Sequence, residues 1–278
     1  MAPQTVAPHR QTVPPLVAPP RALQSTREEI RFRALTHMLA AVAATPAQSR
    51  PFPHVFIEGL FPADLYEEML AWLPEPELYE AFSYEKHATD GQSNRGCFKM
   101  TRESLSRLPE RGRWLWQGVR DALGSPEFKS AVFDRLSEGL AYRFGVSREE
   151  AACTPGYALP ELFRETTGYR IKPHPDTRRK LVTMQIALAQ NDRQQQVGTE
   201  FYSRSLNPMA MLREPRGFDV VKRMPFLPNV AYAFVVINTL RLRSWHGRTT
   251  LEGPCGVRNT ILNIWYARAE DGNPELMG

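Results

Sequence analysis

The feature that most constrains the fold is a change of sequence pattern at about residue 155. Before it, apolar residues recur at the 3.6-residue spacing of amphipathic helices; after it, short β-prone segments alternate with Gly, Pro and Asn. Helices followed by many short strands indicate a helical layer packed on a β-sandwich or barrel. We therefore expect an α+β protein in which residues 25–154 form a mainly helical N-terminal layer of the same domain as a β-rich core at 155–278.

Four segments of the first half have the apolar spacing of amphipathic helices. They cover about 26–45, 62–73, 102–123 and 126–144. The first begins with a hydroxyl followed three residues later by Glu29, which is a capping-box pattern, and it ends before Pro46. A short strand over 53–61 precedes the second. Residues 75–101 and 204–225 are expected to be loops long enough to cover a site.

The second half contains six clear strand candidates bounded by turn-forming residues. They are Leu159–Arg164, Gly168–Lys172, Leu181–Ala189, Thr199–Ser203, Ala231–Ile237 and Arg258–Tyr266. The third alternates between an apolar face and a mixed face that contains Thr183 and Gln185. We expect the apolar face to pack on helices or a second sheet and the mixed face to line a pocket.

Composition argues against several classes of function. The net charge of +5 is small, and no strand of interleaved aromatic and basic residues favours nucleic-acid binding. The three cysteines lack the spacing of a disulfide framework or a zinc finger. The longest apolar run, Val230–Ile237, has eight residues, whereas a membrane-spanning helix needs ~20. We expect neither a nucleic-acid partner nor a membrane segment.

Residues 1–24 are expected to form a disordered, proline-rich tail. Six prolines within residues 1–22 interrupt any continuous apolar run and favour extended, solvated chain. This pattern differs from that of a secretory signal, and with the reduced thiols expected for the cysteines it favours a cytoplasmic location.

His174-Pro175-Asp176 is the first motif that carries chemistry. It follows a strand candidate, and residues i and i+2 of an extended chain project to one face, so the imidazole and the carboxylate can converge on one point. An isolated His-x-Asp is also common as an ordinary surface or core pair, and a metal needs a third ligand. His246 is the other histidine of the β-rich half. Two histidines and one carboxylate on one face of an octahedron suit non-haem Fe(II) and oxygen chemistry.

The residues after His246 strengthen this interpretation. Twelve residues on, Arg258 and Thr260 open the last strand candidate, again at i and i+2. A guanidinium beside a hydroxyl is a good partner for a carboxylate. The sequence thus predicts a third metal ligand, a spacer and a carboxylate clamp in succession.

The order of these motifs resembles that of the Fe(II)/2-oxoglutarate-dependent oxygenases, in particular the bacterial prolyl-4-hydroxylase-like branch. The segments that carry the resemblance are 168–176, 198–202, 227–229 and 244–247. The resemblance covers roughly residues 155–268 and implies a double-stranded β-helix (jelly-roll) core with flanking N-terminal helices. It also implies that His174, Asp176 and His246 bind Fe(II) at the catalytic centre.

The same resemblance implies 2-oxoglutarate and O2 as cosubstrates. Arg258 would pair with the distal carboxylate of 2-oxoglutarate, and Thr260 would add a hydrogen bond where the family more often has serine. Related halogenases lack the carboxylate ligand; because Asp176 is present, we expect hydroxylation rather than halogenation. Desaturation or ring closure would use the same metal centre.

Further candidates flank these motifs. Thr183 and Gln185, on the mixed strand face, are candidate contacts of 2-oxoglutarate. Candidate substrate residues near the iron motif are Arg164, Tyr169, Lys172 and Arg178. Residues 155–268 contain 17 Lys and Arg against eight Asp and Glu, an excess that suits a dicarboxylate cosubstrate and an anionic substrate.

Three hypotheses for function remain open at this stage. The first is a dioxygenase that hydroxylates an unactivated C–H of a small, amino-acid-like or anionic metabolite. The second is a hydroxylase of a peptidyl residue of the prolyl type. The third is a catalytically inactive, cupin-like binding protein, against which the complete His, Asp, His and Arg set argues. The sequence pattern does not specify the oligomeric state.

Overall fold

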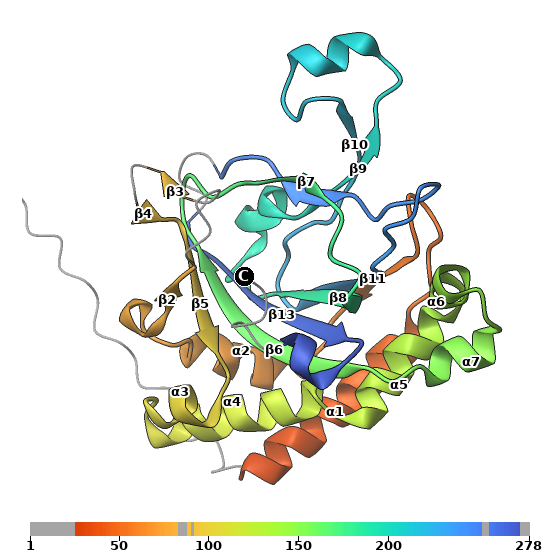
Figure 1. Ribbon diagram of the computed structural model, residues 1–278. Helices are drawn as coiled ribbons and strands as arrows, with labels where there is room; N and C mark the ends of the chain where they lie inside the picture. Colours follow the sequence, from red (N-terminus) through yellow and green to blue (C-terminus); the bar gives the residue numbers. More distant parts are fainter. Residues whose placement is uncertain (1–25, 83–87, 90–91, 252–255, 273–278) are drawn as a thin grey trace, which may run out of the picture.

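A computed structural model describes residues 26–82, 88–89, 92–251 and 256–272, and within them the chain forms helices and antiparallel sheets (Figure 1). The helices are α1 (Arg27–Ala44), α2 (Ala63–Ala71), α3 (Arg102–Ser106), α4 (Glu110–Leu123), α5 (Pro126–Arg135), α6 (Ser137–Phe144) and α7 (Arg148–Cys153). Short 3-10 helices are η1 (Pro76–Leu78), η3 (Asp192–Val197), η4 (Pro208–Leu212) and η5 (Ala269–Gly272).

The strands form a larger and a smaller sheet. The larger has the order β1 (His54–Glu58), β11 (Val230–Val235), β8 (Lys180–Ala187), β13 (Arg258–Tyr266), β6 (Tyr157–Glu165), β5 (Arg95–Lys99) and β2 (Glu80–Ala81). The smaller has the order β10 (Phe218–Arg223), β9 (Glu200–Arg204), β12 (His246–Arg248) and β7 (Ile171–His174). The strands β3 (Ala88–Thr89) and β4 (Gln92–Ser93) form a separate pair. The mixture of helices and antiparallel sheet agrees with the predicted α+β class.

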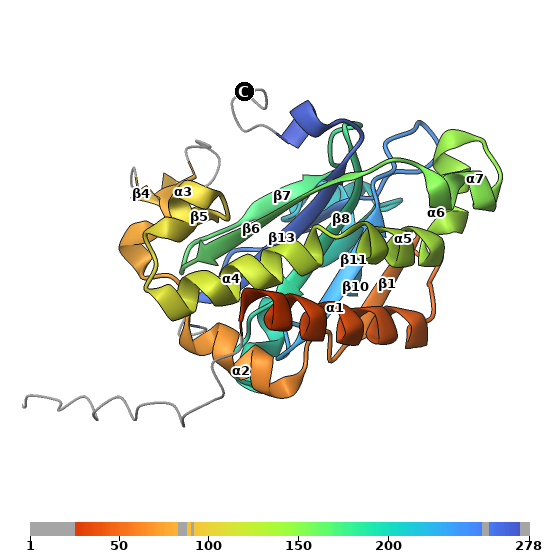
Figure 2. The ribbon, with the colours of Figure 1, turned by 90° about the horizontal axis from the view of Figure 1, so that it is seen from below.

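Helices cover the outer face of the larger sheet, where α1, α4 and α5 lie side by side (Figure 2). Their apolar residues share one buried cluster with Val182, Met184 and Ile186 of β8. This is the apolar face that the alternation along β8 predicts, and it leaves Thr183 and Gln185 on the opposite side. The helical layer therefore supports the sheet from behind and leaves its other face available for a site.

The predicted helices are present, but two of them are divided. The capping box at the start of α1 is confirmed, since the Thr26 hydroxyl accepts from the Glu29 amide and the Glu29 carboxylate accepts from the Thr26 amide. The expected helix at 102–123 is interrupted at Pro109, because proline lacks an N–H and disfavours helical geometry in the residue before it. The expected helix at 126–144 is divided at Leu136, which ends α5 and precedes α6.

Two predicted loops contain ordered secondary structure. Within 75–101, β5 pairs along β6 and adds a strand to the larger sheet. Within 204–225, β10 pairs with β9, and the two strands project from the body as a hairpin that carries η4 (Figure 1). Strands β1 and β5 show that the first half also contributes to the β-structure. The predicted tail at 1–24 lies outside the described residues.

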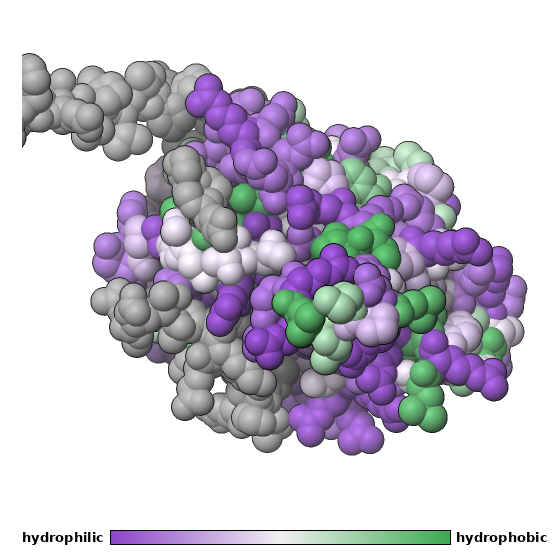
Figure 3. Space-filling view, turned by 90° about the horizontal axis from the view of Figure 1, so that it is seen from above, coloured by the Kyte–Doolittle hydropathy of each residue, from purple (hydrophilic) through white to green (hydrophobic). Residues whose placement is uncertain are grey.

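The face of the molecule that carries the projecting hairpin is mostly hydrophilic, with separate hydrophobic groups (Figure 3). Large apolar side chains of the hairpin are exposed both between its strands, at Leu206, Met209, Met211 and Leu212, and on β10, at Val220 and Val221. Among the described residues, no helix is both long and apolar enough to cross a membrane.

Candidate functional site

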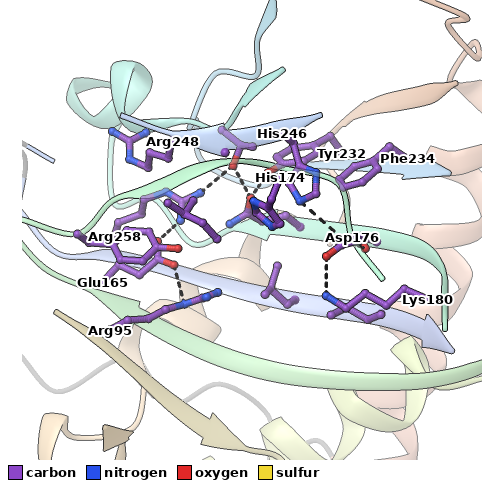
Figure 4. A pocket seen from close by; sticks show the side chains of 18 residues that line it. Arg95, Glu165, His174, Asp176, Lys180, Tyr232, Phe234, His246, Arg248 and Arg258 are labelled. Atoms are coloured by element: carbon purple, nitrogen blue, oxygen red, sulfur yellow. Dashed lines mark hydrogen bonds and ion pairs between the residues drawn. The ribbon is translucent and has the colours of Figure 1, made fainter. Parts of the chain in front are cut away.

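A pocket lies between the two sheets and is lined by side chains from both (Figure 4). Its residues divide into two groups. His174, Asp176 and His246 lie with Lys180 toward one end, and Arg258, Arg248 and Glu165 lie toward the other. We call these the metal end and the arginine end.

Strand pairing brings the three candidate metal ligands together. Strands β7 and β12 pair so that His174 and His246 are direct cross-strand partners, and their ring centroids are 4.4 Å apart. Asp176 follows the end of β7, and one ligand atom from each of the three residues lies within 4.8 Å of the others. At Gly247, a Cβ atom would lie 2.7 Å from the carbonyl oxygen of Ile171. Glycine there allows β12 to lie close against β7 beside the histidines.

The hydrogen bonds of both histidines leave the same ring nitrogen available. The Nδ1 of His174 lies 2.9 Å from the Lys172 carbonyl oxygen, and the Nδ1 of His246 lies 2.9 Å from the Ser244 carbonyl oxygen. A carbonyl only accepts, so Nδ1 carries the proton in each ring and Nε2 keeps its lone pair. Such a backbone contact fixes the ring orientation of a metal-binding histidine.

The protonation states also suit a cation. Burial, with the neighbouring His246, lowers the pKa of His174 to about 4, and burial lowers the pKa of His246 as well. Burial alone would raise the pKa of Asp176, but Lys180 and the two histidines outweigh it and hold that pKa below its usual range. At neutral pH the site thus offers two neutral imidazoles and one ionised carboxylate, a donor set that fits a divalent metal such as Fe(II).

Two side chains that contact Asp176 hold its carboxylate in place. The Lys180 ammonium donates to Oδ1 at 2.7 Å, and the Thr183 hydroxyl donates to Oδ2 at 2.7 Å. Oδ2 also lies 3.7 Å from the Nε2 of His246. Thr183, a predicted contact of 2-oxoglutarate, therefore bonds to the candidate metal ligand. Lys180 and Thr183 are three residues apart, a spacing that a regular strand would put on opposite faces, but the pairing of β8 with β13 is irregular next to Lys180 and both side chains line the pocket.

The arginine end is built on a row of charges across three neighbouring strands. Glu165 of β6 is the register partner of Arg95 on β5 and of Arg258 on β13. The Nε of Arg95 lies 3.1 Å from one carboxylate oxygen of Glu165, and Arg258 is ion-paired with the other. Glu165 and Arg258 are almost fully buried. The carboxylate of Glu165 compensates part of the positive charge of the two guanidinium groups, whose burial without a counter-charge would be unfavourable.

Arg258 lies where the sequence places a carboxylate clamp. Its Nε donates to the Val197 carbonyl at 2.8 Å, and a terminal nitrogen lies 3.4 Å from the Thr199 hydroxyl. The hydroxyl of Thr260 is fully buried and has no hydrogen-bond partner among the described residues. Thr260 is not itself part of the pocket lining, although Arg258, Leu262 and Ile264 of the same strand are. Its unpartnered buried donor, two residues from Arg258, fits a carboxylate such as that of 2-oxoglutarate that reaches it.

Between the two ends, Gln185 joins a small polar network. Its side-chain oxygen accepts from the Thr199 hydroxyl at 2.7 Å and from the Tyr232 hydroxyl. Burial raises the pKa of Tyr232, so its hydroxyl stays protonated and can donate. Gln185 therefore lines the pocket as its strand face predicts, and a ligand that spans the two ends would pass beside it.

The four candidate substrate residues lie in different places. Tyr169 is buried in the pocket, at the arginine end. Arg164 of β6 is absent from the pocket lining, since its neighbour Glu165 takes the inward position. Lys172 is exposed, and Arg178 is exposed with its guanidinium bonded to the Asn238 carbonyl at 2.9 Å. The structure brings only Tyr169 to the pocket.

Sequence reasoning missed several pocket residues: Arg95, Glu165, Lys180, Tyr232 and Arg248. Arg95 lies in the segment 75–101, which the sequence predicts to be a loop, and the strand predicted at 159–164 ends one residue before Glu165. Arg248 stands two residues after His246, at the spacing that had already joined His174 to Asp176, so this signal was available. Burial lowers the pKa of Arg248 to about 10, which leaves it charged at neutral pH.

Comparison with known proteins adds structural relatives. No protein-family model matches the chain, and no curated protein matches it. An oxidoreductase of the 2OG-Fe(II) oxygenase family from Burkholderia pseudomallei is 12% identical, with 83% of this chain and 91% of that chain covered and a TM-score of 0.45. In structure, this chain is similar to Fe(II)/2-oxoglutarate oxygenases.

Two further solved structures show the same similarity. A Pseudomonas putida prolyl-4-hydroxylase is 10% identical, with 84% of this chain and 99% of that chain covered and a TM-score of 0.44. HygX from Streptomyces hygroscopicus, solved with nickel and 2-oxoglutarate bound, is 12% identical, with 82% and 85% covered and a TM-score of 0.40.

Proposed function

We propose that this chain is an Fe(II)/2-oxoglutarate-dependent dioxygenase. The observation that carries the proposal is one pocket with His174, Asp176 and His246 within 4.8 Å of one another at one end and the buried guanidinium of Arg258 at the other. The reaction would convert a substrate C–H, 2-oxoglutarate and O2 into a C–OH, succinate and CO2. The double-stranded β-helix implied by the sequence resemblance is part of the proposal, and the pocket between two antiparallel sheets supports it.

In this proposal His174, Asp176 and His246 would hold the iron. The Nε2 atoms of the two histidines and the Oδ2 of Asp176 are the donors, and the contacts to Lys172, Ser244, Thr183 and Lys180 orient them. When bound, the metal supplies oxygen activation coupled to decarboxylation of the 2-oxo acid. The protein residues set the ligand geometry and shield the site from water.

Arg258 and Thr260 would hold the distal carboxylate of 2-oxoglutarate. Gln185 and Tyr232 lie beside the path between this carboxylate and the metal end, where their polar atoms would orient the cosubstrate. Because one end of the pocket holds the metal ligands and the other holds the hydrogen-bond donors of Arg258, the cosubstrate would bind in one direction. Its 2-oxo acid group would lie toward the metal ligands.

The substrate class in this proposal is a small, anionic or amino-acid-like molecule that is hydroxylated at an unactivated carbon. The positive excess of residues 155–268 supports an anionic substrate. Asp176 supports hydroxylation over halogenation, because it fills the coordination position that a chloride ion would need.

Release of succinate tests the proposal. Purified protein with Fe(II), ascorbate and 2-oxoglutarate should release succinate slowly on its own and faster with a true substrate. Under anaerobic conditions, Fe(II) and 2-oxoglutarate together should also give a weak visible charge-transfer band. Protein that binds Fe(II) but shows neither the band nor succinate would instead be an inactive binding protein.

A further inference from the structure

Arg248 is a second arginine at the arginine end of the pocket, and neither the metal nor the assigned contacts of 2-oxoglutarate give it a role. Arg248 of β12 lines the pocket and is only 7% exposed. One terminal nitrogen donates to the Gly198 carbonyl, but its Nε is buried without a hydrogen-bond partner among the described residues. A buried guanidinium with an unused donor is costly unless an anion completes it.

The two carboxylates that act electrostatically on Arg248, those of Glu165 and Glu200, are already engaged. Glu165 is held between Arg95 and Arg258, and Glu200 is held by Arg223 and by the Tyr202 hydroxyl. Neither carboxylate forms an ion pair with Arg248 in the described part of the chain. At this end the guanidinium groups of Arg95 and Arg258 share the carboxylate of Glu165, whereas the guanidinium of Arg248 has no ion-pair partner among the described residues (Figure 4).

The donors of Arg258, by contrast, are largely taken. Its Nε bonds to the Val197 carbonyl, one terminal nitrogen to Glu165 and the other to the Thr199 hydroxyl. A carboxylate that arrived at Arg258 alone would have to compete with Glu165 for the same guanidinium. Arg248 offers positive charge and an unused donor at the same end of the pocket.

From this arrangement we infer that Arg248 is a second cosubstrate-binding residue, which holds the distal carboxylate of 2-oxoglutarate together with Arg258 and makes the site specific for a dicarboxylate. This inference rests on the proposed function and extends it to a residue that the motif pattern does not include. The neutralisation of Arg258 by Glu165 is the reason why a second cation is needed.

Calorimetric binding to the Mn(II)-loaded protein, without a primary substrate, tests the inference. The probes are 2-oxoglutarate and 2-oxopentanoate, which keeps the 2-oxo acid and the five-carbon chain but replaces the distal carboxylate by a neutral methyl group. Arg248→Gln should weaken binding of 2-oxoglutarate by about 10- to 100-fold, the loss expected for a charged hydrogen bond. Binding of 2-oxopentanoate should change by less than about twofold.

Arg241→Gln is the matched control, since it removes the same charge from an exposed position of the preceding turn and should leave both affinities unchanged. Arg248→Lys keeps the charge but loses the bidentate guanidinium. It should weaken binding of 2-oxoglutarate severalfold and leave binding of 2-oxopentanoate unchanged, and it replaces the glutamine variant if that variant does not fold. An Arg248 variant that binds 2-oxoglutarate as tightly as the original protein overturns the inference. Failure of the original protein to bind 2-oxoglutarate at all would refute the proposed function instead.

Discussion

The two ends of the pocket differ in how their charges are arranged. At the metal end, every candidate ligand is already oriented, the histidines by backbone carbonyls and Asp176 by Lys180 and Thr183. At the arginine end, Arg95 and Arg258 share the carboxylate of Glu165, and within the described part of the chain neither the Nε of Arg248 nor the hydroxyl of Thr260 has a hydrogen-bond partner. The metal end is prepared for a cation, and the arginine end is prepared for an anion. The following predictions test that difference, from the largest expected effect to the smallest.

Removing a metal ligand should have the largest effect. We expect His174→Ala to lower metal affinity and succinate release by more than about 100-fold, because loss of a direct ligand exceeds the 10–100-fold cost of disturbing its neighbours. The measurements are Mn(II) binding and succinate release. His37→Ala, at an exposed histidine of α1, is the control and should have no effect. Normal metal binding by the His174 variant would refute the ligand assignment.

Removing the carboxylate at the arginine end should mainly affect stability. Glu165→Gln leaves Arg95 and Arg258 without their shared counter-charge, and breaking a buried ion pair costs about 3–5 kcal/mol in the free energy of unfolding. Urea denaturation measures this loss. Glu138→Gln removes an exposed ion-pair partner of Arg148 and should cost less than about 1 kcal/mol. An equal loss of unfolding free energy in the two variants would contradict a special role for the buried charges of Arg95, Glu165 and Arg258.

Substitution of Thr183 tests whether this residue serves the metal end or the cosubstrate. Because its hydroxyl bonds to Asp176, we expect Thr183→Val to weaken Mn(II) binding by about tenfold. Affinity for 2-oxoglutarate at saturating metal should be unchanged, and Thr36→Val at an exposed site of α1 should change neither. If the variant instead bound 2-oxoglutarate more weakly and bound metal normally, Thr183 would be a contact of the cosubstrate, as its strand face predicts.

The dependence on pH should be small until the solution becomes acidic. Metal binding requires a neutral imidazole, and the pKa of His174 is lowered to about 4 by burial and by His246. Protons therefore compete with the metal only as the pH falls toward this value. We expect Mn(II) affinity to vary by less than about twofold between pH 8 and 6 and to fall below about pH 5. A loss that begins near pH 6.5 would indicate a histidine with its ordinary pKa.

The sequence predicted the metal end better than the arginine end. His174 and Asp176 are two residues apart, and only His246 had to be added from a distant strand. The register of β7 and β12 then placed the histidines opposite each other. At the arginine end, Glu165, Arg95 and Arg248 are far apart in sequence, and no local pattern connects them. No local pattern predicts the hydrogen bond from Thr183 to Asp176 either, and the contact of Thr183 with 2-oxoglutarate stays a prediction.

The sequence alone determined the α+β class, the capped first helix, most of the strands and the three candidate metal ligands. These features depend on local spacing, since the periods of 3.6 and 2 and the i, i+2 relation act within a few residues. Tertiary structure alone decided that β1 and β5 join the larger sheet, that Lys180 and Thr183 orient Asp176, and that Glu165 occupies Arg258. Those contacts depend on the order and register of strands, and pairing energies between distant segments fix these only when the whole sheet has formed.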